Sequence, residues 1–301
     1  MSDRTEPGPS ETGPAQPGVG QPLPADEWAE PPEWKPVPPP HPLAVPIIDA
    51  HTHLDAGGCR TADDIAAVLR RARAVGVTGV VTVADDLASA RWAAAAATQH
   101  PDVWAAIGLH PTRADVLDGD AKAELEMLAG RPRVVAIGET GLDYYWEAAP
   151  HDVQRAAFAW HIDLAKRLGK PLMIHDRNAH DDVLAILETE GAPSEVIFHC
   201  FSGNAAMARI CVDRGYLLSF AGPVSFRNAK DLHAAVQVAP AESILVETDA
   251  PFLAPHPHRG RKNESYALPY TLRAIAELRK TDIVELATTV MTTTRRLYKI
   301  S

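Results

Sequence analysis

Two histidines, His51 and His53, stand one residue apart in the stretch VPIIDAHTHLD, directly after a short apolar run. Alternate residues of a β-strand point to the same face, so both imidazoles could enter one cavity. Imidazole is a common ligand of divalent metals, but two polar residues that simply end a strand give the same pattern. The pair becomes informative if further ligand-type residues follow at matching places in the chain.

Four more residues of this kind directly follow apolar runs: Glu139 in AIGETG, His175 in LMIHD, His199 in IFHCFSG and Asp249 in LVETDAP. A carboxylate at the end of an apolar strand is costly unless something pairs with it. A divalent cation pairs with several such groups at once. We therefore predict that six residues bind metal, namely His51, His53, Glu139, His175, His199 and Asp249.

The predicted ligands are imidazoles and carboxylates without a thiolate, a mixture that suits Zn²⁺, Mn²⁺ or Mg²⁺ in a catalytic site. Six ligands exceed the need of one tetrahedral ion. We predict two divalent metal ions per chain, about 3.5–4 Å apart and sharing a carboxylate. Glu139 is the predicted bridge, because its strand lies between that of the histidine pair and those of His175 and His199.

The elements that must position these residues alternate along the chain from residue 46 onward. Eight short β-branched runs are each followed by an Ala/Leu-rich helical segment. The runs are almost continuously apolar, which is typical of strands buried on both faces. We predict an α/β fold, a (β/α)8 TIM-like barrel over residues 46–301, with the six ligands at the C-terminal end of its strands. A doubly wound sheet of eight strands is the alternative.

Residues 1–45 differ from the rest in composition. They are rich in proline, glycine and acidic residues, and they carry half of the formal net charge of −10. Such a segment buries too little apolar area to offset the entropy of ordering, so we predict a disordered or polyproline II tail. A protein partner of the tail stays open beside a solubilising role. Because much of the acidic excess lies here, net charge does not exclude a nucleic-acid partner.

The cysteine pattern and the hydropathy indicate in which cellular compartment the protein is expected. The three cysteines show no CxxC spacing, which argues against a disulfide frame. No apolar run approaches the roughly 18 residues that span a membrane, and the first residues lack the pattern of a secretory signal. We expect a cytoplasmic protein without a membrane partner.

Six motifs occur in the order in which TatD-type metal-dependent deoxyribonucleases, a family of amidohydrolase-like barrels, carry them. These are DAHTHLD, GLHP, GETGLDYY, IHDR, HCFSG and ETDAPFLAPHPHRGRKNE, and the resemblance covers about Ile47 to Leu297. It implies a (β/α)8 barrel and a divalent-metal nuclease with the six residues above as ligands. Ser265 and the C-terminal TTTRRLY depart from the family pattern, away from the ligand positions.

The function expected from this resemblance and from the site is a metal-dependent phosphodiester hydrolase. It would be a deoxyribonuclease, an exonuclease on single-stranded or frayed DNA, in which metals activate water and Asp249 takes the proton. Asp249 and Glu139 are the predicted catalytic residues. The alternative is an amidohydrolase or esterase such as a D-aminoacyl-tRNA deacylase, although many amidohydrolases place a carbamylated lysine where this chain has Glu139. A non-catalytic scaffold is a third hypothesis, but it needs no converging ligands.

Substrate contacts are expected from residues near the ligands. We predict that His110 in GLHP contacts a substrate phosphate or supports a ligand, with a loop-capping role as the alternative. Arg177, Arg259 and Arg261 are predicted to hold phosphates, and the alternative is a solvated basic loop.

Two further features near the ligands each have two interpretations. Asp143 could orient a ligand histidine or cap a turn. The aromatic run at residues 144–146 could stack bases or cover the barrel rim. His161 and His233 are expected to be packing or surface residues.

Overall fold

Eight parallel strands form one sheet in which each strand pairs with the next in the sequence, from β1 to β8. The structure is a computed structural model and describes residues 35–146 and 148–300. The strands are β1 (Ile47–Thr52), β2 (Val77–Val83), β3 (Val103–Ile107), β4 (Val134–Asp143), β5 (Leu172–Arg177), β6 (Val196–Phe198), β7 (Leu217–Phe220) and β8 (Ile244–Val246).

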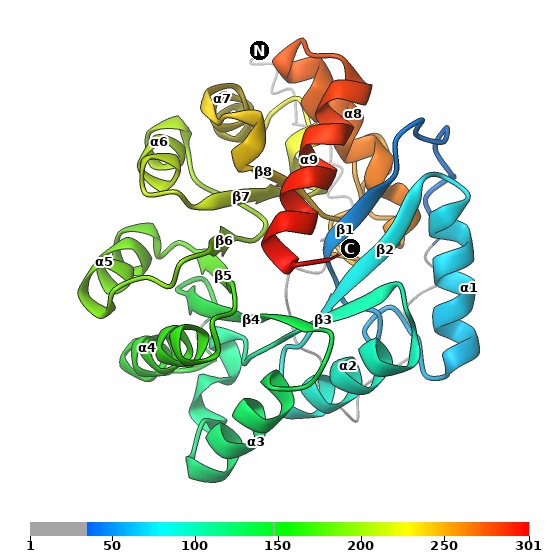
Figure 1. Cartoon of the computed structure of the whole chain (residues 1–301). Helices are drawn as coiled ribbons and strands as arrows, with labels where there is room; N and C mark the ends of the chain where they lie inside the picture. Colours follow the sequence, from blue (N-terminus) through cyan, green and yellow to red (C-terminus); the bar gives the residue numbers. More distant parts are fainter. Residues whose placement is uncertain (1–34, 147, 301) are drawn as a thin grey trace, which may run out of the picture. The chain divides into compact units, whose positions relative to one another are not determined.

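Helices surround this sheet on its outer side (Figure 1). They are α1 (Ala62–Arg73), α2 (Leu87–Gln99), α3 (Gly119–Ala129), α4 (His151–Leu168), α5 (His180–Glu190), α6 (Ala205–Asp213), α7 (Lys230–Val238), α8 (Leu268–Arg279) and α9 (Ile283–Tyr298). Short 3₁₀ helices are η1 (Pro111–Val116), η2 (Gly222–Ser225), η3 (Ala241–Ser243) and η4 (Ser265–Ala267). Within the described part of the chain, no helix has the length and apolar character needed to cross a membrane.

The sheet closes on itself between β8 and β1. The backbone N–H of Asp249, just beyond β8, donates to the carbonyl of His51 at 3.0 Å, and that of His53 donates to the carbonyl of Ala250 at 2.7 Å. A doubly wound sheet would reverse its strand order at a switch point, whereas here the order runs without reversal. The predicted barrel is therefore confirmed.

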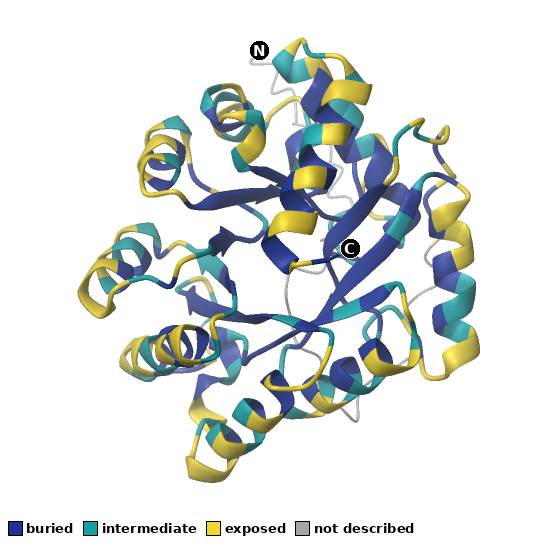
Figure 2. Ribbon diagram, in the orientation of Figure 1, coloured by how far each residue is buried: buried dark blue, intermediate teal, exposed yellow. Residues whose placement is uncertain are grey.

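The core has two layers, one between sheet and helices and one inside the barrel. Figure 2 shows the strands mostly buried, with exposed residues confined largely to the outward faces of the helices. Each of the eight strands contributes an inward residue to the inner layer, from Ile48 in β1 to Leu245 in β8. Met291 and Leu297 of α9 complete this layer, and the Tyr298 hydroxyl donates to the carbonyl of Ala50 at 3.2 Å. Helix α9 thus covers the end where the strands begin and leaves the opposite end for a site.

Local sequence signals set the helix boundaries. Thr61 caps α1: its hydroxyl accepts from the backbone N–H of Asp64 at 3.3 Å, and the Asp64 carboxylate accepts from the Thr61 N–H at 2.8 Å. This reciprocal pair is a capping box, in which each residue satisfies a backbone N–H that the helix leaves free. Gly169 ends α4 with a φ of 60°, the left-handed conformation that favours glycine.

Residues 35–43, which we call the strap, lie against the barrel although their composition placed them in the predicted tail. Val37 is 1% exposed. The strap carbonyls accept hydrogen bonds from side chains around α8: Val37 from the Tyr266 hydroxyl, Pro38 from the Tyr270 hydroxyl at 3.2 Å, and His41 from Arg273 Nη2 at 2.7 Å. These donors order a proline-rich segment that can donate few hydrogen bonds itself.

The compact unit that contains the barrel therefore begins at Lys35 rather than at residue 46. The rest of the predicted tail, residues 1–34, lies outside the described residues.

We expect deletion of residues 1–44 to destabilise the barrel and deletion of residues 1–34 to leave its stability unchanged. The longer deletion uncovers the surface beneath Val37, and burial of one valine contributes roughly 1.5–3 kcal/mol. In a domain of this size, that loss lowers Tm by about 5 °C. Thermal unfolding of both truncations and of Val37→Asp in the full chain measures the effect. Equal Tm values for all three and the native chain would show that the strap adds no stability.

Candidate metal centre

The six predicted ligands meet at the C-terminal end of the barrel strands. His51, Glu139 and His175 belong to β1, β4 and β5. The other three, His53, His199 and Asp249, follow β1, β6 and β8 within three residues. Five of the six are buried, and His175 is partly exposed. Parallel strands bring their carboxyl ends to one edge of the sheet, so residues far apart in the chain become neighbours here.

Glu139 occupies the middle of this cluster. Its Oε1 lies 3.7 Å from His51 Nε2 and 3.5 Å from His53 Nε2. Its Oε2 lies 3.2 Å from His175 Nδ1 and 3.0 Å from His199 Nε2. The two oxygens of one carboxylate thus face two different pairs of histidines.

Asp249 lies beside the first pair of histidines, His51 and His53. Its Oδ1 lies 3.5 Å from His51 Nε2 and 3.3 Å from His53 Nε2. Asp249 has a φ of 53°, a left-handed conformation that aspartate and asparagine adopt more readily than most residues. This turn in the backbone places its carboxylate above the end of β1.

The donor atoms therefore form two triads. His51, His53 and Asp249 make the first triad, and Glu139, His175 and His199 make the second; within each, the donor atoms lie within 4.8 Å of one another. Each triad combines imidazole nitrogens with a carboxylate and lacks a thiolate, a donor set that suits Zn²⁺ or Mn²⁺. The site can therefore hold divalent metal.

Glycines on both sides of Glu139 let β4 and β5 approach closely. Gly138 and Gly141 have φ values of 145° and 137°. A Cβ on Gly138 would lie 2.5 Å from the carbonyl oxygen of Met173, and one on Gly141 would lie 2.1 Å from that of His175. A residue with a side chain would be strained at these φ values and would clash with the neighbouring carbonyl oxygen. The GETG sequence thus brings Glu139 up against the strand that carries His175.

The charges in the site favour ionised carboxylates. Burial alone would raise the pKa of Glu139, but His199 and hydrogen bonds from His175 and His199 hold it well below its usual range. Burial and the neighbouring His199 lower the pKa of His51, so this imidazole stays neutral. Burial also acts on His53, but nearby carboxylates, first Asp85, raise its pKa well above the usual value. The buried carboxylates thus hold a proton on His53, and a bound cation would take the place of that proton.

Glu247 supports the second triad, and sequence reasoning missed it. It is buried, and its Oε1 accepts from His199 Nδ1 at 2.9 Å and from the backbone N–H of Cys200 at 2.8 Å. Glu247 thereby holds the ring so that Nε2 is directed at Glu139 Oε2, 3.0 Å away, as for a ligand histidine oriented by a carboxylate. The available signal was the spacing, because Glu247 directly follows the apolar run of the last expected strand and stands two residues before Asp249.

Asp143 both orients a histidine and caps a turn, the two roles that the sequence left open. Its Oδ2 accepts from His175 Nε2 at 2.9 Å. Its Oδ1 accepts from the backbone N–H groups of Tyr145 and Trp146, both at 2.9 Å. One carboxylate therefore orients a predicted ligand and caps the turn after β4.

Two other aspartates near the first triad were also missed. Asp49 is fully buried and accepts from the backbone N–H and the hydroxyl of Thr248 at 2.9 and 2.6 Å. Asp85 follows β2, and its Oδ1 lies 3.6 Å from His53 Nδ1. Burial raises the pKa of each to about 7. Asp49 ties β1 to the residue before Asp249, and Asp85 adds a carboxylate beside His53.

His110 presents an N–H group toward the second triad. Its Nδ1 accepts from the backbone N–H of Thr112 at 3.2 Å and lies 2.6 Å from the Thr112 hydroxyl. A neutral imidazole that accepts at Nδ1 carries its proton on Nε2, and this Nε2 lies 3.3 Å from His175 Nδ1. Burial lowers the pKa of His110 to about 3, which keeps the ring neutral. The capping interpretation therefore holds for one nitrogen, and the other faces the site.

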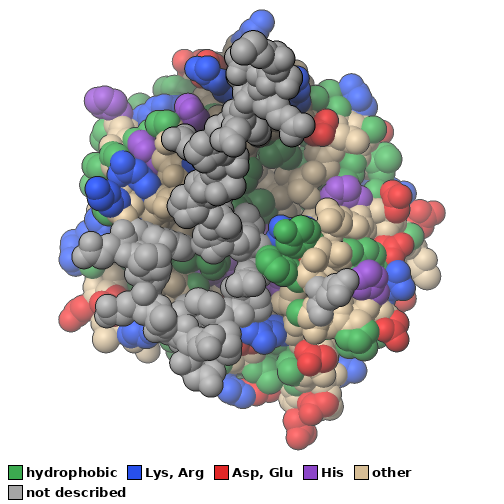
Figure 3. Space-filling model, turned by 180° about the vertical axis from the view of Figure 1, so that it is seen from behind, with side chains coloured by type: hydrophobic (Ala, Val, Ile, Leu, Met, Phe, Trp, Pro, Cys, Tyr) green, Lys and Arg blue, Asp and Glu red, His purple; other side chains and the backbone are tan. Residues whose placement is uncertain are grey.

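The predicted phosphate-binding arginines lie at two different places, one at the end of β5 and two in the loop before η4. Arg177 ends β5, and its guanidinium lies 3.9 Å from the centre of the Tyr145 ring. Arg259 lies 4.1 Å from the ring of Phe226, and Arg261 Nη1 donates to the strap carbonyl of Pro36 at 3.1 Å. On the side away from α9, Figure 3 shows lysine and arginine side chains spread around the face rather than gathered in one patch.

The two other histidines have packing roles, as expected. His161 is fully buried; its Nδ1 donates to the carbonyl of Ala157 at 2.7 Å, and its Nε2 accepts from the N–H of Leu109 at 3.2 Å. His233 Nε2 donates to the carbonyl of Val224 at 3.0 Å. His161 thereby fixes the backbone next to His110.

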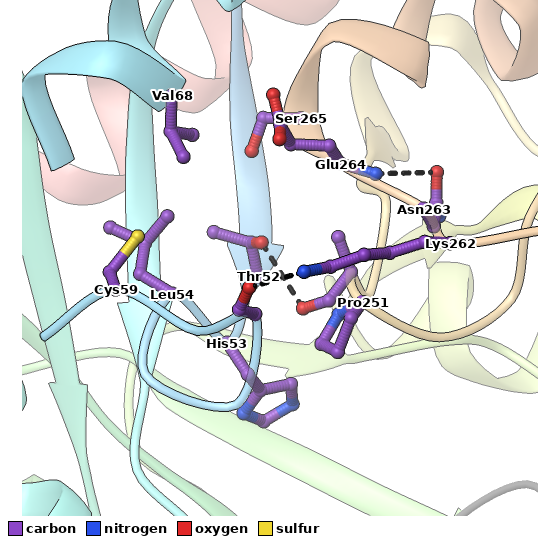
Figure 4. Close-up of a pocket in the computed structure, with 12 residues that line it drawn as sticks. Thr52, His53, Leu54, Cys59, Val68, Pro251, Lys262, Asn263, Glu264 and Ser265 are labelled. Carbon is purple, nitrogen blue, oxygen red and sulfur yellow. Dashed lines mark hydrogen bonds between the residues drawn. The ribbon is translucent and has the colours of Figure 1, made fainter. Parts of the chain in front are cut away.

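A small hollow lies behind His53, between β1, α1 and the loop before η4 (Figure 4). Lys262 crosses it and donates from Nζ to the carbonyl of Gly57 at 2.7 Å. Asn263 Nδ2 donates to the carbonyls of Thr248 and Phe252 at 2.9 and 2.7 Å. The imidazole of His53 points away from this hollow in Figure 4. The hydrogen bonds of Lys262 and Asn263 thus connect the loops around the hollow, while the His53 imidazole faces the other predicted ligands.

Comparison with known proteins agrees with this geometry. Residues 48–299 match the model of the TatD-related DNase family. An uncharacterised metal-dependent hydrolase TatD of Mycobacterium tuberculosis is 60% identical, over 84% of this chain and 97% of that protein. A 3'-5' ssDNA/RNA exonuclease TatD of Erwinia tasmaniensis is 33% identical, over 77% of this chain and 93% of that protein.

The fold is shared with a solved structure as well. The crystal structure of YJJV, a TatD homolog from Escherichia coli, superposes with a TM-score of 0.79 at 27% identity, covering 85% of this chain and 98% of that one. The matched residues include all six members of the two triads. The chain belongs to the TatD-related DNase family of metal-dependent hydrolases.

Proposed function

We propose that this chain is a deoxyribonuclease, a divalent-metal-dependent phosphodiester hydrolase that removes nucleotides from single-stranded or frayed DNA ends. The observation that carries the proposal is Glu139, whose Oε1 faces the histidines of the first triad and whose Oε2 faces the histidines of its own triad. Family membership supports the metal-dependent hydrolase. The Erwinia relative, named an exonuclease for single-stranded DNA and RNA, supports a nucleic-acid substrate.

The two triads would hold two divalent ions, Mg²⁺, Mn²⁺ or Zn²⁺. His51, His53 and Asp249 would hold one ion, and His175 and His199 the other, with Glu139 shared between them. When bound, the ions supply positive charge that polarises the phosphate and activates water. Glu247 and Asp143 keep the histidines of the second triad oriented.

The side chains of the site divide the remaining work. Asp249 accepts the proton of the attacking water, as a carboxylate within hydrogen-bond reach can. His110, held neutral, donates its Nε2–H to a phosphate oxygen. Arg177, Arg259 and Arg261 hold the phosphates of neighbouring nucleotides, and Arg261 does so from the loop that it also ties to the strap.

A metal-dependent amidohydrolase or esterase, such as a D-aminoacyl-tRNA deacylase, is the second candidate because the same centre could activate water against an acyl group. The residue of β4 that lies in the metal centre argues for the nuclease. It is Glu139 and not a lysine, so the carbamylated-lysine bridge found in many amidohydrolases has no counterpart here.

The test is hydrolysis of end-labelled single-stranded DNA by the metal-stripped chain after Mg²⁺, Mn²⁺ or Zn²⁺ is restored separately. We expect shortening of the DNA from one end with at least one metal, and none without metal. A D-aminoacyl-tRNA is assayed under the same conditions. Deacylation of the tRNA without cleavage of DNA would replace the first candidate by the second.

A further inference from the structure

The turn after β4 carries three adjacent aromatic residues beside the second triad. We propose that Tyr145, Trp146 and Arg177, here called the platform, stack an unpaired nucleobase of the substrate. The proposal deepens the nuclease function given above and rests on it. It assigns to the site a contact with the base, in addition to the contacts with phosphate.

The three side chains of the platform already contact one another. The guanidinium of Arg177 lies 3.9 Å from the centre of the Tyr145 ring and 5.7 Å from that of Trp146. The two aromatic rings meet edge to face, with centroids 4.9 Å apart and an interplanar angle of 89°. Cation–π contact of this kind fixes the orientation of an exposed ring. Tyr145 nevertheless keeps 51% of its surface exposed.

The preceding residue, Tyr144, has the alternative role of packing against the rim of the barrel. Its hydroxyl donates to Asp182 Oδ2 at 2.6 Å, and its ring stacks on His151 with centroids 3.8 Å apart and planes 12° from parallel. Tyr144 therefore fastens the turn to α4 and α5. Tyr145 lacks such packing among the described residues and is one of the few large exposed apolar side chains there. The aromatic run thus divides into a packing residue and an exposed one.

A single carboxylate connects the platform to the second triad. Asp143 accepts from the backbone N–H groups of Tyr145 and Trp146 and also from His175 Nε2. Arg177 pairs with Asp143 in the register of β4 and β5 and stands two residues after His175. A base stacked on Tyr145 therefore has its own phosphate beside a predicted metal ligand, and Arg177 adds a positive charge at that place.

Stacking of this kind selects an unpaired base. In a duplex, both faces of each internal base are already stacked on its neighbours, so a protein ring must compete with that stacking. In a single strand or a frayed end, the base can turn onto the aromatic ring. Stacking of one base then adds to the binding free energy, whichever base it is. The platform would therefore favour single-stranded ends over blunt duplex ends.

The experiment compares Tyr145→Leu with Tyr145→Phe in the full chain loaded with metal. Leucine keeps the bulk and apolar character but removes the aromatic face, whereas phenylalanine keeps it. The substrates are short single-stranded oligonucleotides that carry one abasic residue at each of the terminal positions in turn. We expect Tyr145→Leu to raise KM roughly 5- to 100-fold with kcat little changed, and Tyr145→Phe to behave as the native chain.

The abasic substrates give the deciding readout. At one position, loss of the base should raise the KM of the native chain by about the factor seen for Tyr145→Leu, and it should add nothing further in that variant. If the two effects multiply, or if Tyr145→Leu has the native KM, the platform does not bind a base and the hydrolase assignment stands. If the native chain cleaves none of the oligonucleotides with any metal, the proposed function fails and the platform fails with it.

Discussion

Asp249→Asn should lower the turnover of a short oligonucleotide by roughly 10²-fold or more, because the change removes the carboxylate that we propose as the proton acceptor of the attacking water. The fold should be unaffected. Asparagine tolerates the left-handed conformation that Asp249 adopts at a φ of 53°, and the amide has the shape of the carboxylate. Steady-state hydrolysis over a titration of the metal measures the effect.

His51→Ala is the control for this variant. It removes a predicted ligand rather than the proton acceptor, so it should weaken metal affinity, and excess metal should restore part of the activity. Asp249→Asn should stay impaired at saturating metal. Near-normal turnover of Asp249→Asn under those conditions would show that another group takes the proton.

Glu139→Gln should be at least as damaging. The carboxylate contacts both triads, and its replacement by a neutral amide removes the negative charge that the two ions would share. Charge stabilisation by metals in such sites amounts to several kcal/mol of the barrier, so a loss of roughly 10³-fold in kcat/KM is expected. The variant should also bind fewer ions than the native chain.

Glu139→Asp separates charge from reach. Aspartate keeps the negative charge but is one methylene shorter, so it cannot face both triads in the same way. We expect this variant to retain one ion and to lose most of the activity. If Glu139→Gln keeps both the native metal content and the native rate, Glu139 does not bridge the two triads.

The barrel and the six converging residues could be predicted because both follow from local patterns. An apolar run long enough to be buried on both faces indicates a parallel strand, and a polar residue at its end lies at the shared edge of the sheet. His51 and Glu139 are 88 positions apart in the sequence. Once each was assigned to the end of its own strand, their proximity followed.

The supporting carboxylates could not be predicted with the same certainty. Asp49 lies inside β1 and Glu247 directly follows β8, and sequence alone does not distinguish a buried acceptor at these positions from a residue that faces solvent. Their partners, His199 and Thr248, are determined only when β6, β8 and β1 come together. The strap was misassigned for a related reason. Its composition resembles that of a disordered segment, and the donors that order it, such as Tyr266 and Arg273, lie more than 200 residues later in the chain.

The number of divalent ions bound per chain tests the account most directly. The measurement is elemental analysis of the native chain after dialysis against Mg²⁺, Mn²⁺ or Zn²⁺ and removal of free metal, with Glu139→Gln treated in parallel. Two triads that share Glu139 predict about two ions per native chain and fewer in the variant. A metal content near zero with every ion offered would contradict the assignment of the site.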